Sequence, residues 1–218
     1  SVPAHLLHPL PPGMPVSHAA IVEPTVVALH AVLGASPNPG DVVLVTGPGP
    51  VGLLTAQCAR AAGADVYVAG APADREVRLA LAQELGMTVL DPDLPVVEAL
   101  RGAAGRQAHL VFECSGSANA VAGALAAVAT GGSITLVGLF PTSVDIDLSV
   151  AIRREVTLRT SYIGGWNDFE RAIGLLATGA IRVDRFFRTY PLDDAQQAFD
   201  DAKARRVLKP LLIPPGAG

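Results

Sequence analysis

The sequence predicts an α/β fold built on a doubly wound parallel sheet. From Asp41 onward, short runs rich in β-branched residues alternate with helical runs. The β runs are apolar on both faces, which is typical of parallel strands covered by helices on both sides. A glycine-rich turn, TGPGPVG, lies directly between the first β run and the helix that follows it. A doubly wound sheet is the simplest arrangement that satisfies all of these features.

The elements of this sheet follow one another in a regular order. The predicted strands are residues 42–47, 65–70, 88–90, 109–114, 133–138 and 155–162. The predicted helices between them are residues 50–63, 73–86, 96–102 and 117–129. The first of these helices ends at Gly63, and Asp74 is a candidate N-cap of the second. Trp166 and Phe169 begin a further helix, where packing is the favoured role for both rings.

The two ends of the chain depart from the alternation. Residues 1–16 are proline-rich, residues 17–34 are helical with an interruption at Pro24, and residues 36–41 form a turn-rich linker. At the other end we expect a strand, a helix and a strand at residues 186–192, 193–204 and 208–214. Both ends therefore have the character of a seam, that is, of segments that contact another domain.

Composition excludes several classes of protein. Of the 218 residues, 50% are hydrophobic and 17% are charged, so the chain has enough apolar surface to fold around a core. The net charge of -4 offers no basic surface for nucleic acid or an anionic membrane. Cys58 and Cys114 lie far apart without a CxxC pattern, which indicates a reducing, cytoplasmic setting without structural zinc. Glycines and Pro141 divide the longest uncharged stretch, and the N-terminus lacks the cationic start of a signal peptide, so no membrane segment is expected.

The glycine-rich turn carries the strongest chemical signal. Gly47, Gly49 and Gly52 match the GxGxxG pattern between a strand and its helix, and Pro50 and Val51 complete the turn. The first glycine permits the tight turn, the second lets the backbone approach a pyrophosphate, and the third lets helix and strand pack closely. The helix N-terminus adds free N–H groups for the phosphates. Dinucleotide binding is favoured over a purely steric glycine turn and over the related S-adenosylmethionine loop of methyltransferases.

The end of the second strand bears on the choice of dinucleotide. An acidic residue there would bind the adenosine ribose of NAD and repel the 2′-phosphate of NADP, but the sequence has Gly70 at this place. Arg75 and Arg78 follow, and a guanidinium there would hold a phosphate; the alternative is that both are solvated helix residues. We therefore expect binding of both NAD and NADP with at most a modest preference, and Gly70→Asp to shift the preference toward NAD. Gly70 also disfavours a methyltransferase.

Several segments in the right order resemble the medium-chain dehydrogenase/reductase family, in particular its zinc-dependent alcohol, polyol and threonine dehydrogenases. The segments that carry the resemblance are VEPTVVALHAV, NPGDVVLVTGPGPVGLLTAQCARAAGA, RLALAQELG, FECSG, GGSITLVGL and the closing YPLDDAQQAFDDA with KPLLIP. The resemblance implies hydride transfer between NAD or NADP and a secondary alcohol or polyol. It also implies a homodimer or a higher homo-oligomer. The run at residues 146–162 points the same way, because its last strand lies at the sheet edge and an apolar, unblocked edge tends to pair.

The resemblance implies a zinc-bearing catalytic domain whose ligands are absent from this sequence. The expected organisation is a seam segment at residues 1–36, a dinucleotide-binding Rossmann domain at 37–185, and a C-terminal helix and strand at 186–218 that return to the seam. Glu23, before Pro24, matches a glutamate that lies at the catalytic zinc in polyol dehydrogenases. Glu23 would serve there only together with the missing domain, and the plainer interpretation is that it ends or caps a helix.

Further cofactor contacts are implied at the ends of the fourth and fifth strands. Cys114 and Ser115 match positions beside the cofactor, although Cys114 also fits a small buried residue. The segment Val137, Gly138 and Leu139 resembles the backbone that faces the nicotinamide, against the alternative of a plain strand end. Two rival functions remain open: a zinc-free quinone or enoyl reductase, and a non-catalytic dinucleotide-binding module.

Overall fold

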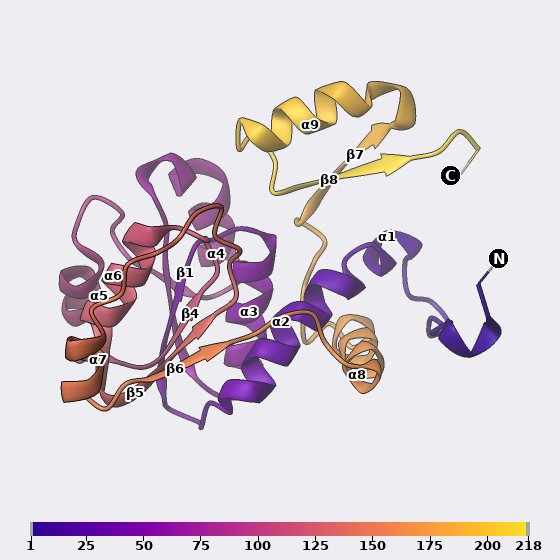
Figure 1. Ribbon diagram of the computed structural model, residues 1–218. Coiled ribbons are helices and arrows are strands. Elements are labelled where there is room, and N and C mark those ends of the chain that lie inside the picture. Colours follow the sequence, from indigo (N-terminus) through magenta and orange to yellow (C-terminus); the bar gives the residue numbers. More distant parts are fainter. Residues whose placement is uncertain (1, 217–218) are drawn as a thin grey trace.

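The computed structural model describes residues 2–216 and contains a parallel sheet with helices on both faces (Figure 1). The strand order is β3-β2-β1-β4-β5-β6, and every neighbouring pair is parallel. The strands are β1 (Val42–Thr46), β2 (Asp65–Ala69), β3 (Thr88–Val89), β4 (Ala108–Glu113), β5 (Val128–Leu136) and β6 (Thr157–Thr160). The predicted fold class is confirmed, and β6 lies at the sheet edge as expected.

Successive residues of a strand point to opposite faces of the sheet, and each face is covered by its own set of helices. Val43 and Val45 of β1 join one buried cluster, whereas Val42 and Leu44 join the other. The first cluster is covered by α2 (Val22–Ala35), α3 (Pro50–Ala61), α4 (Ala80–Glu84) and α8 (Trp166–Ala177). The second is covered by α5 (Val96–Ala104), α6 (Ala118–Ala127) and α7 (Leu148–Arg153).

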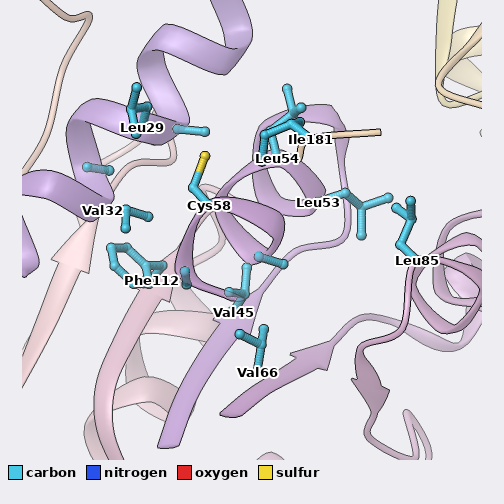
Figure 2. Close-up of a cluster of buried hydrophobic side chains, with 14 of the residues drawn as sticks. Leu29, Val32, Val45, Leu53, Leu54, Cys58, Val66, Leu85, Phe112 and Ile181 are labelled. Carbon is cyan, nitrogen blue, oxygen red and sulfur yellow. The ribbon is translucent and has the colours of Figure 1, made fainter. Parts of the chain in front are cut away.

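Helix α3 forms the centre of the first cluster (Figure 2). In Figure 2, Cys58 points toward the side chains of α2, Leu54 lies beside Ile181, and Leu53 faces Leu85. Leu53 and Leu54 are fully buried. Because α3 begins at the glycine-rich turn, this packing fixes the turn against the strands.

The N-terminal helical region divides before its proline. A short helix, α1 (Val16–Ala19), ends two residues before α2, and Pro24 lies within the first turn of α2. Proline lacks an N–H group and its ring excludes the carbonyl four residues earlier, so it is accommodated only in a first helical turn. The helical region was predicted to be interrupted at Pro24; this is wrong, because Pro24 is helical and the interruption lies at Ala20 and Ile21. A 3₁₀ turn at Ala4–Leu6 precedes α1.

The helical region after β2 is less regular than the predicted helix 73–86. It consists of a 3₁₀ turn (Pro72–Asp74), a π-helical turn (Arg75–Leu79) and then α4. Asp74 occupies the predicted N-cap position, directly before the π-helical turn, but its side chain makes no capping bond to that turn and Oδ2 instead accepts the amide of Ala71 at 3.0 Å. Proline at the start of the 3₁₀ turn permits this earlier beginning, since a first-turn residue needs no N–H partner.

Helix α7 is not among the predicted elements, because it lies within the run at residues 146–162 that leads into the edge strand. The Oδ1 atom of Asp147 accepts a hydrogen bond from the amide of Val150 at 3.0 Å and so caps this helix. Among residues 2–216, no helix is both long enough and apolar enough to cross a bilayer.

The C-terminal residues form a small unit with its own parallel sheet of two strands. This unit contains β7 (Phe187–Pro191), a 3₁₀ turn (Leu192–Asp194), α9 (Ala195–Lys203) and β8 (Lys209–Ile213). It lies beside the six-stranded sheet in Figure 1, with α9 packed along β8. The Tyr190 hydroxyl donates to Asp201 at 2.6 Å and joins β7 to α9. The segment that leads into this unit is held by Gln57 of α3, whose side-chain amide makes two hydrogen bonds to the backbone of Arg182.

Candidate cofactor site

A cleft of about 830 Å³ lies at the carboxyl ends of β1, β2 and β4. Its walls come from the glycine-rich turn after β1, the segment after β2, the loop after β4 and the start of α6. Ligands of doubly wound sheets bind at this end of the strands, where the order of strands reverses. In this sheet the reversal falls between β1 and β4, so the cleft occupies the expected place.

The three glycines of the turn have different structural reasons. Gly47 has a φ of +89°, and a Cβ atom there would lie 2.7 Å from Ser115. A Cβ atom on Gly52 would lie 2.0 Å from the carbonyl oxygen of Gly47, so helix and strand touch at this point. Gly49 differs, because a Cβ atom there would meet nothing within 4 Å. The turn therefore keeps open space at the one glycine that is expected to approach a pyrophosphate.

The start of α3 leaves backbone donors free at the same place. Gly49 is the N-cap and makes no side-chain capping bond, and Pro50 occupies the first helical position. The amides of Val51 and Gly52 lie in the first turn, where N–H groups have no partner within the helix. Such groups, together with the positive end of the helix dipole, favour an anionic ligand.

A buried carboxylate shapes the opposite wall of the cleft. Glu113, at the end of β4, is fully buried and accepts the amides of Ser115 at 2.7 Å and Gly116 at 3.1 Å. The Ser115 hydroxyl donates to the same carboxylate. The backbone carbonyl of Glu113 accepts the amides of Val137 and Gly138. Glu113 lies within the FECSG motif but is not among the predicted site residues; an acidic residue just before a small polar loop is the signal that would have identified it.

The structure brings part of the predicted set to the cleft. Gly47, Gly49, Gly70, Arg78, Cys114 and Ser115 line it. Of the other predicted residues, Pro50, Val51 and Gly52 begin α3 directly after Gly49, whereas Val137 packs in the main core and Leu139 is exposed to solvent. Gly138 lies against Gly116, where a Cβ atom would come within 2.3 Å of the Gly116 nitrogen.

Arg75 is not brought to the cleft. Its guanidinium is exposed and pairs with Asp93 at 2.6 Å and Asp91 at 3.8 Å. Arg78, one turn later, faces the cleft and pairs with Asp74 at 3.2 Å. Arg75 and Arg78, for which the same phosphate contact was predicted, thus have different surroundings.

Gly70 is crowded as well as uncharged. A Cβ atom there would lie 2.8 Å from Cγ of Pro48 and 3.1 Å from Leu79. A side chain at position 70 would therefore displace the proline ring of the glycine-rich turn. The expected shift toward NAD in Gly70→Asp would be accompanied by a disturbed pyrophosphate site.

Neither cysteine has the environment of a reactive thiolate. Burial raises the pKa of the Cys114 thiol to about 12. The weak hydrogen bond with Thr55 lowers this pKa, but by less than burial raises it. Burial also raises the pKa of Cys58 to about 12. Because nucleophiles and metal ligands act as thiolates, neither cysteine is expected to serve as a nucleophile or a metal ligand here.

Comparison with known proteins assigns the chain to a family. The family model described as "Zinc-binding dehydrogenase" matches residues 50–178, which cover more than half of the chain. The chain belongs to the zinc-binding dehydrogenase family. The resemblance seen in the sequence is thereby confirmed.

Among the curated relatives of the chain, the sorbitol dehydrogenase of Halalkalibacterium halodurans is 32% identical over 95% of the chain and 62% of its own length. The D-arabitol-phosphate dehydrogenase of Enterococcus avium is 34% identical over 94% of the chain and 60% of its own length. A solved structure assigned to the zinc-binding dehydrogenases, from Sinorhizobium meliloti 1021 and bound to NADP, is 32% identical with a TM-score of 0.86. The match covers 94% of this chain and 61% of the chain in that structure. The chain thus spans about 60% of the length of its relatives.

The family's name implies zinc, which the described residues do not fit. In residues 2–216, no three side chains of His, Cys, Asp or Glu gather where they could hold a metal ion. Glu23 is exposed in the first turn of α2, and His30 bonds to Asp168 at 2.9 Å. A protein zinc site needs three or four ligands, so residues 2–216 do not form one by themselves.

Proposed function

We propose that this chain is the cofactor-binding part of an NAD(P)-dependent dehydrogenase that transfers hydride between a nicotinamide and a secondary alcohol, polyol or the corresponding ketone. The observation that carries the proposal is the glycine-rich turn at the start of α3. Gly49 of this turn is open to the cleft, while Gly47 and Gly52 are in close contact with their neighbours. The similarity to sorbitol and arabitol-phosphate dehydrogenases supports the class of substrate. The NADP-bound structural neighbour supports the class of cofactor.

The residues of the cleft fit a dinucleotide in distinct ways. The backbone at Gly47–Gly49 and the free amides at the start of α3 would hold the pyrophosphate. Glu113 fixes the loop at Ser115 and Gly116, which forms the facing wall. A bound nicotinamide cofactor supplies the hydride chemistry, and the protein holds and orients it.

The site residues that do not line the cleft keep a more limited role in the proposal. Val137, Gly138 and Leu139 follow β5, next to the loop after β4, and their backbone is the part offered to a nicotinamide. Substrate contacts and any zinc ligands would lie in protein outside residues 2–216. Glu23 would join them only if such a domain covers the first turn of α2.

The division of the chain is also part of the proposal. Residues 37–185 are proposed as the dinucleotide-binding domain, with residues 1–36 and 186–218 as the seam toward the rest of the enzyme. The separate sheet of β7 and β8 supports this division. We further propose a cytoplasmic homodimer; the edge position of β6 and the two free cysteines support it.

Calorimetric titration of the 218-residue chain with NAD, NADP and S-adenosylmethionine tests the proposed function. We expect one site per chain for either dinucleotide and no heat of binding with S-adenosylmethionine. Binding of S-adenosylmethionine alone would replace the dehydrogenase assignment with a methyltransferase-like site. A chain that binds none of the three would contradict the proposal.

A further inference from the structure

An arginine from the C-terminal unit lines the cofactor cleft. Arg205 follows α9 and lies 131 residues from Asp74 in the sequence, yet its Nη1 atom is 3.0 Å from Oδ1 of Asp74. Its backbone has a φ of +58°, a left-handed conformation that turns the chain directly after the helix. Arg205 therefore connects the C-terminal unit to the segment after β2.

Asp74 holds two guanidinium groups in place. Only 5% of its side chain is exposed, and Oδ1 accepts both Arg78 at 3.2 Å and Arg205 at 3.0 Å. Its Oδ2 atom accepts the amide of Ala71. A buried carboxylate is stable only when it is paired in this way, so the two arginines are held by a fixed anchor.

The cluster has a positive charge and unused donors. Among the described residues that line the cleft, the charged side chains are those of Asp74, Arg78 and Arg205. Their net charge is +1. Within residues 2–216, Nε of Arg78 is buried and has no hydrogen-bond partner. Arg205 is 44% exposed, so its guanidinium remains accessible from the cleft. Guanidinium groups with spare N–H donors bind phosphate oxygens through short, charge-assisted hydrogen bonds.

The position of the cluster identifies which phosphate it would meet. Asp74 and Arg78 follow β2 and lie near Gly70, and this end of a dinucleotide site receives the adenosine ribose. The oxygens of Asp74 already accept three donors, so this carboxylate is poorly placed to select a free ribose hydroxyl. We propose that Arg78 and Arg205, anchored by Asp74, bind the 2′-phosphate of NADP, and that Arg205 is a specificity-determining residue. This inference rests on the proposed function and extends it to the choice of cofactor.

Two other arginines close in sequence to the proposed pair, Arg75 and Arg206, make their ion pairs outside the cleft, and Arg75 supplies a control. Arg75 lies close to Arg78 in sequence but pairs with Asp93 outside the cleft. Arg206 is the neighbour of Arg205 and pairs with Asp201 at 2.7 Å within the C-terminal unit. Arg75→Ala removes the same charge from an exposed place, and it disturbs no residue that lines the cleft.

The test is calorimetric titration of the wild-type chain and of the variants Arg205→Ala, Arg78→Ala and Arg75→Ala with NADP and NAD. Adenosine 2′,5′-bisphosphate and adenosine 5′-monophosphate serve as small probes of the ribose end alone. Thermal melting of each variant checks folding. We expect Arg205→Ala to weaken NADP and the bisphosphate about tenfold or more, as for the loss of one charge-assisted hydrogen bond.

The same substitution is expected to change the affinities for NAD and the monophosphate less than about twofold, and Arg75→Ala to leave all four affinities unchanged. Arg205→Lys should restore part of the NADP affinity, because it keeps the charge but loses the planar fork. If Arg205→Ala weakens NAD and NADP equally, or weakens neither, the specificity role is overturned while the dinucleotide site stands. If the folded wild-type chain binds neither dinucleotide, the proposed function fails together with this inference.

Discussion

The carboxylate of Glu113 accepts a hydrogen bond from the backbone amide of Ser115 at 2.7 Å. The same carboxylate accepts the amide of Gly116, and Glu113 is fully buried at the end of β4. Ser115 in turn lies so close to the glycine-rich turn that a Cβ atom on Gly47 would be 2.7 Å from it. The two walls of the cleft are thus fixed in contact with each other through one buried side chain.

Glu113→Ala is expected to lower the free energy of unfolding by about 3 kcal/mol, because it removes the buried charged acceptor of the Ser115 and Gly116 amides. Urea denaturation measures this change, and calorimetry should show weaker dinucleotide binding by the folded fraction. Glu113→Gln should lose less stability, since the amide keeps one acceptor oxygen. Glu98→Ala, an exposed change in α5, is the control. Wild-type stability in Glu113→Ala would show that the loop does not depend on this carboxylate.

The contact between Asp168 of α8 and His30 of α2 is expected to make the stability of the chain depend on pH in the acid range. Burial alone would raise its pKa, but hydrogen bonds from the amide of Gly165 and from His30, with the charges of His30 and Arg171, hold the pKa below the ordinary value of 3.8. A lowered pKa means that the stabilisation is complete above the ordinary value and is lost as pH falls through the folded-state pKa.

Asp168→Asn is therefore expected to be less stable than wild type at neutral pH, and this difference should shrink as the pH falls below the ordinary carboxyl pKa. Chemical denaturation at a series of pH values measures it. Asp193→Asn, at an exposed aspartate, is the matched control and should track wild type throughout. A difference that stays constant down to about pH 2 would show that ionised Asp168 does not stabilise the fold.

The purified chain is expected to hold no stoichiometric zinc and to catalyse no alcohol-dependent reduction of NAD or NADP. The reason is that the described residues do not gather three potential ligands at one place. Elemental analysis and an absorbance assay for the reduced cofactor measure the two outcomes. One tightly held zinc per chain, or measurable turnover, would refute this expectation.

Two copies of the chain are expected to pair through the edge of the sheet at β6, which is a short and largely exposed strand. Light scattering at high concentration should give the mass of a dimer. Leu158→Lys should shift the equilibrium toward monomers, because a charged side chain on an edge strand opposes pairing. A strictly monomeric wild-type chain would be incompatible with this arrangement.

The central strands and the glycine-rich turn could be predicted because their signals are local. β1 is buried along its whole length, so its apolar run stands out in the sequence, and the turn residues follow directly. The region after β2 was predicted less well. There, the bond between Asp74 and Ala71 replaces the ordinary capping of a helix, and Pro72 starts the turn earlier.

The charged end of the site could not be predicted, because its partners are distant in the sequence. Arg205 meets Asp74 only after the C-terminal unit has docked beside the segment that follows β2. Arg75 and Arg78 have similar sequence surroundings, yet one pairs with Asp93 outside the cleft and the other lines it. Only tertiary structure separates these two side chains.

The central claim is that the glycine-rich turn binds a nicotinamide dinucleotide. The most direct measurement is the dinucleotide affinity of Gly49→Val and of wild type by calorimetry. Position 49 has an ordinary φ of -73° and open space, so the variant should fold normally while its side chain fills the place of the pyrophosphate. Gly165→Val, at the similar N-cap of α8, is the control. The account predicts that wild type and Gly165→Val bind NAD and NADP and that Gly49→Val binds neither; equal dinucleotide affinity in Gly49→Val and wild type would contradict it.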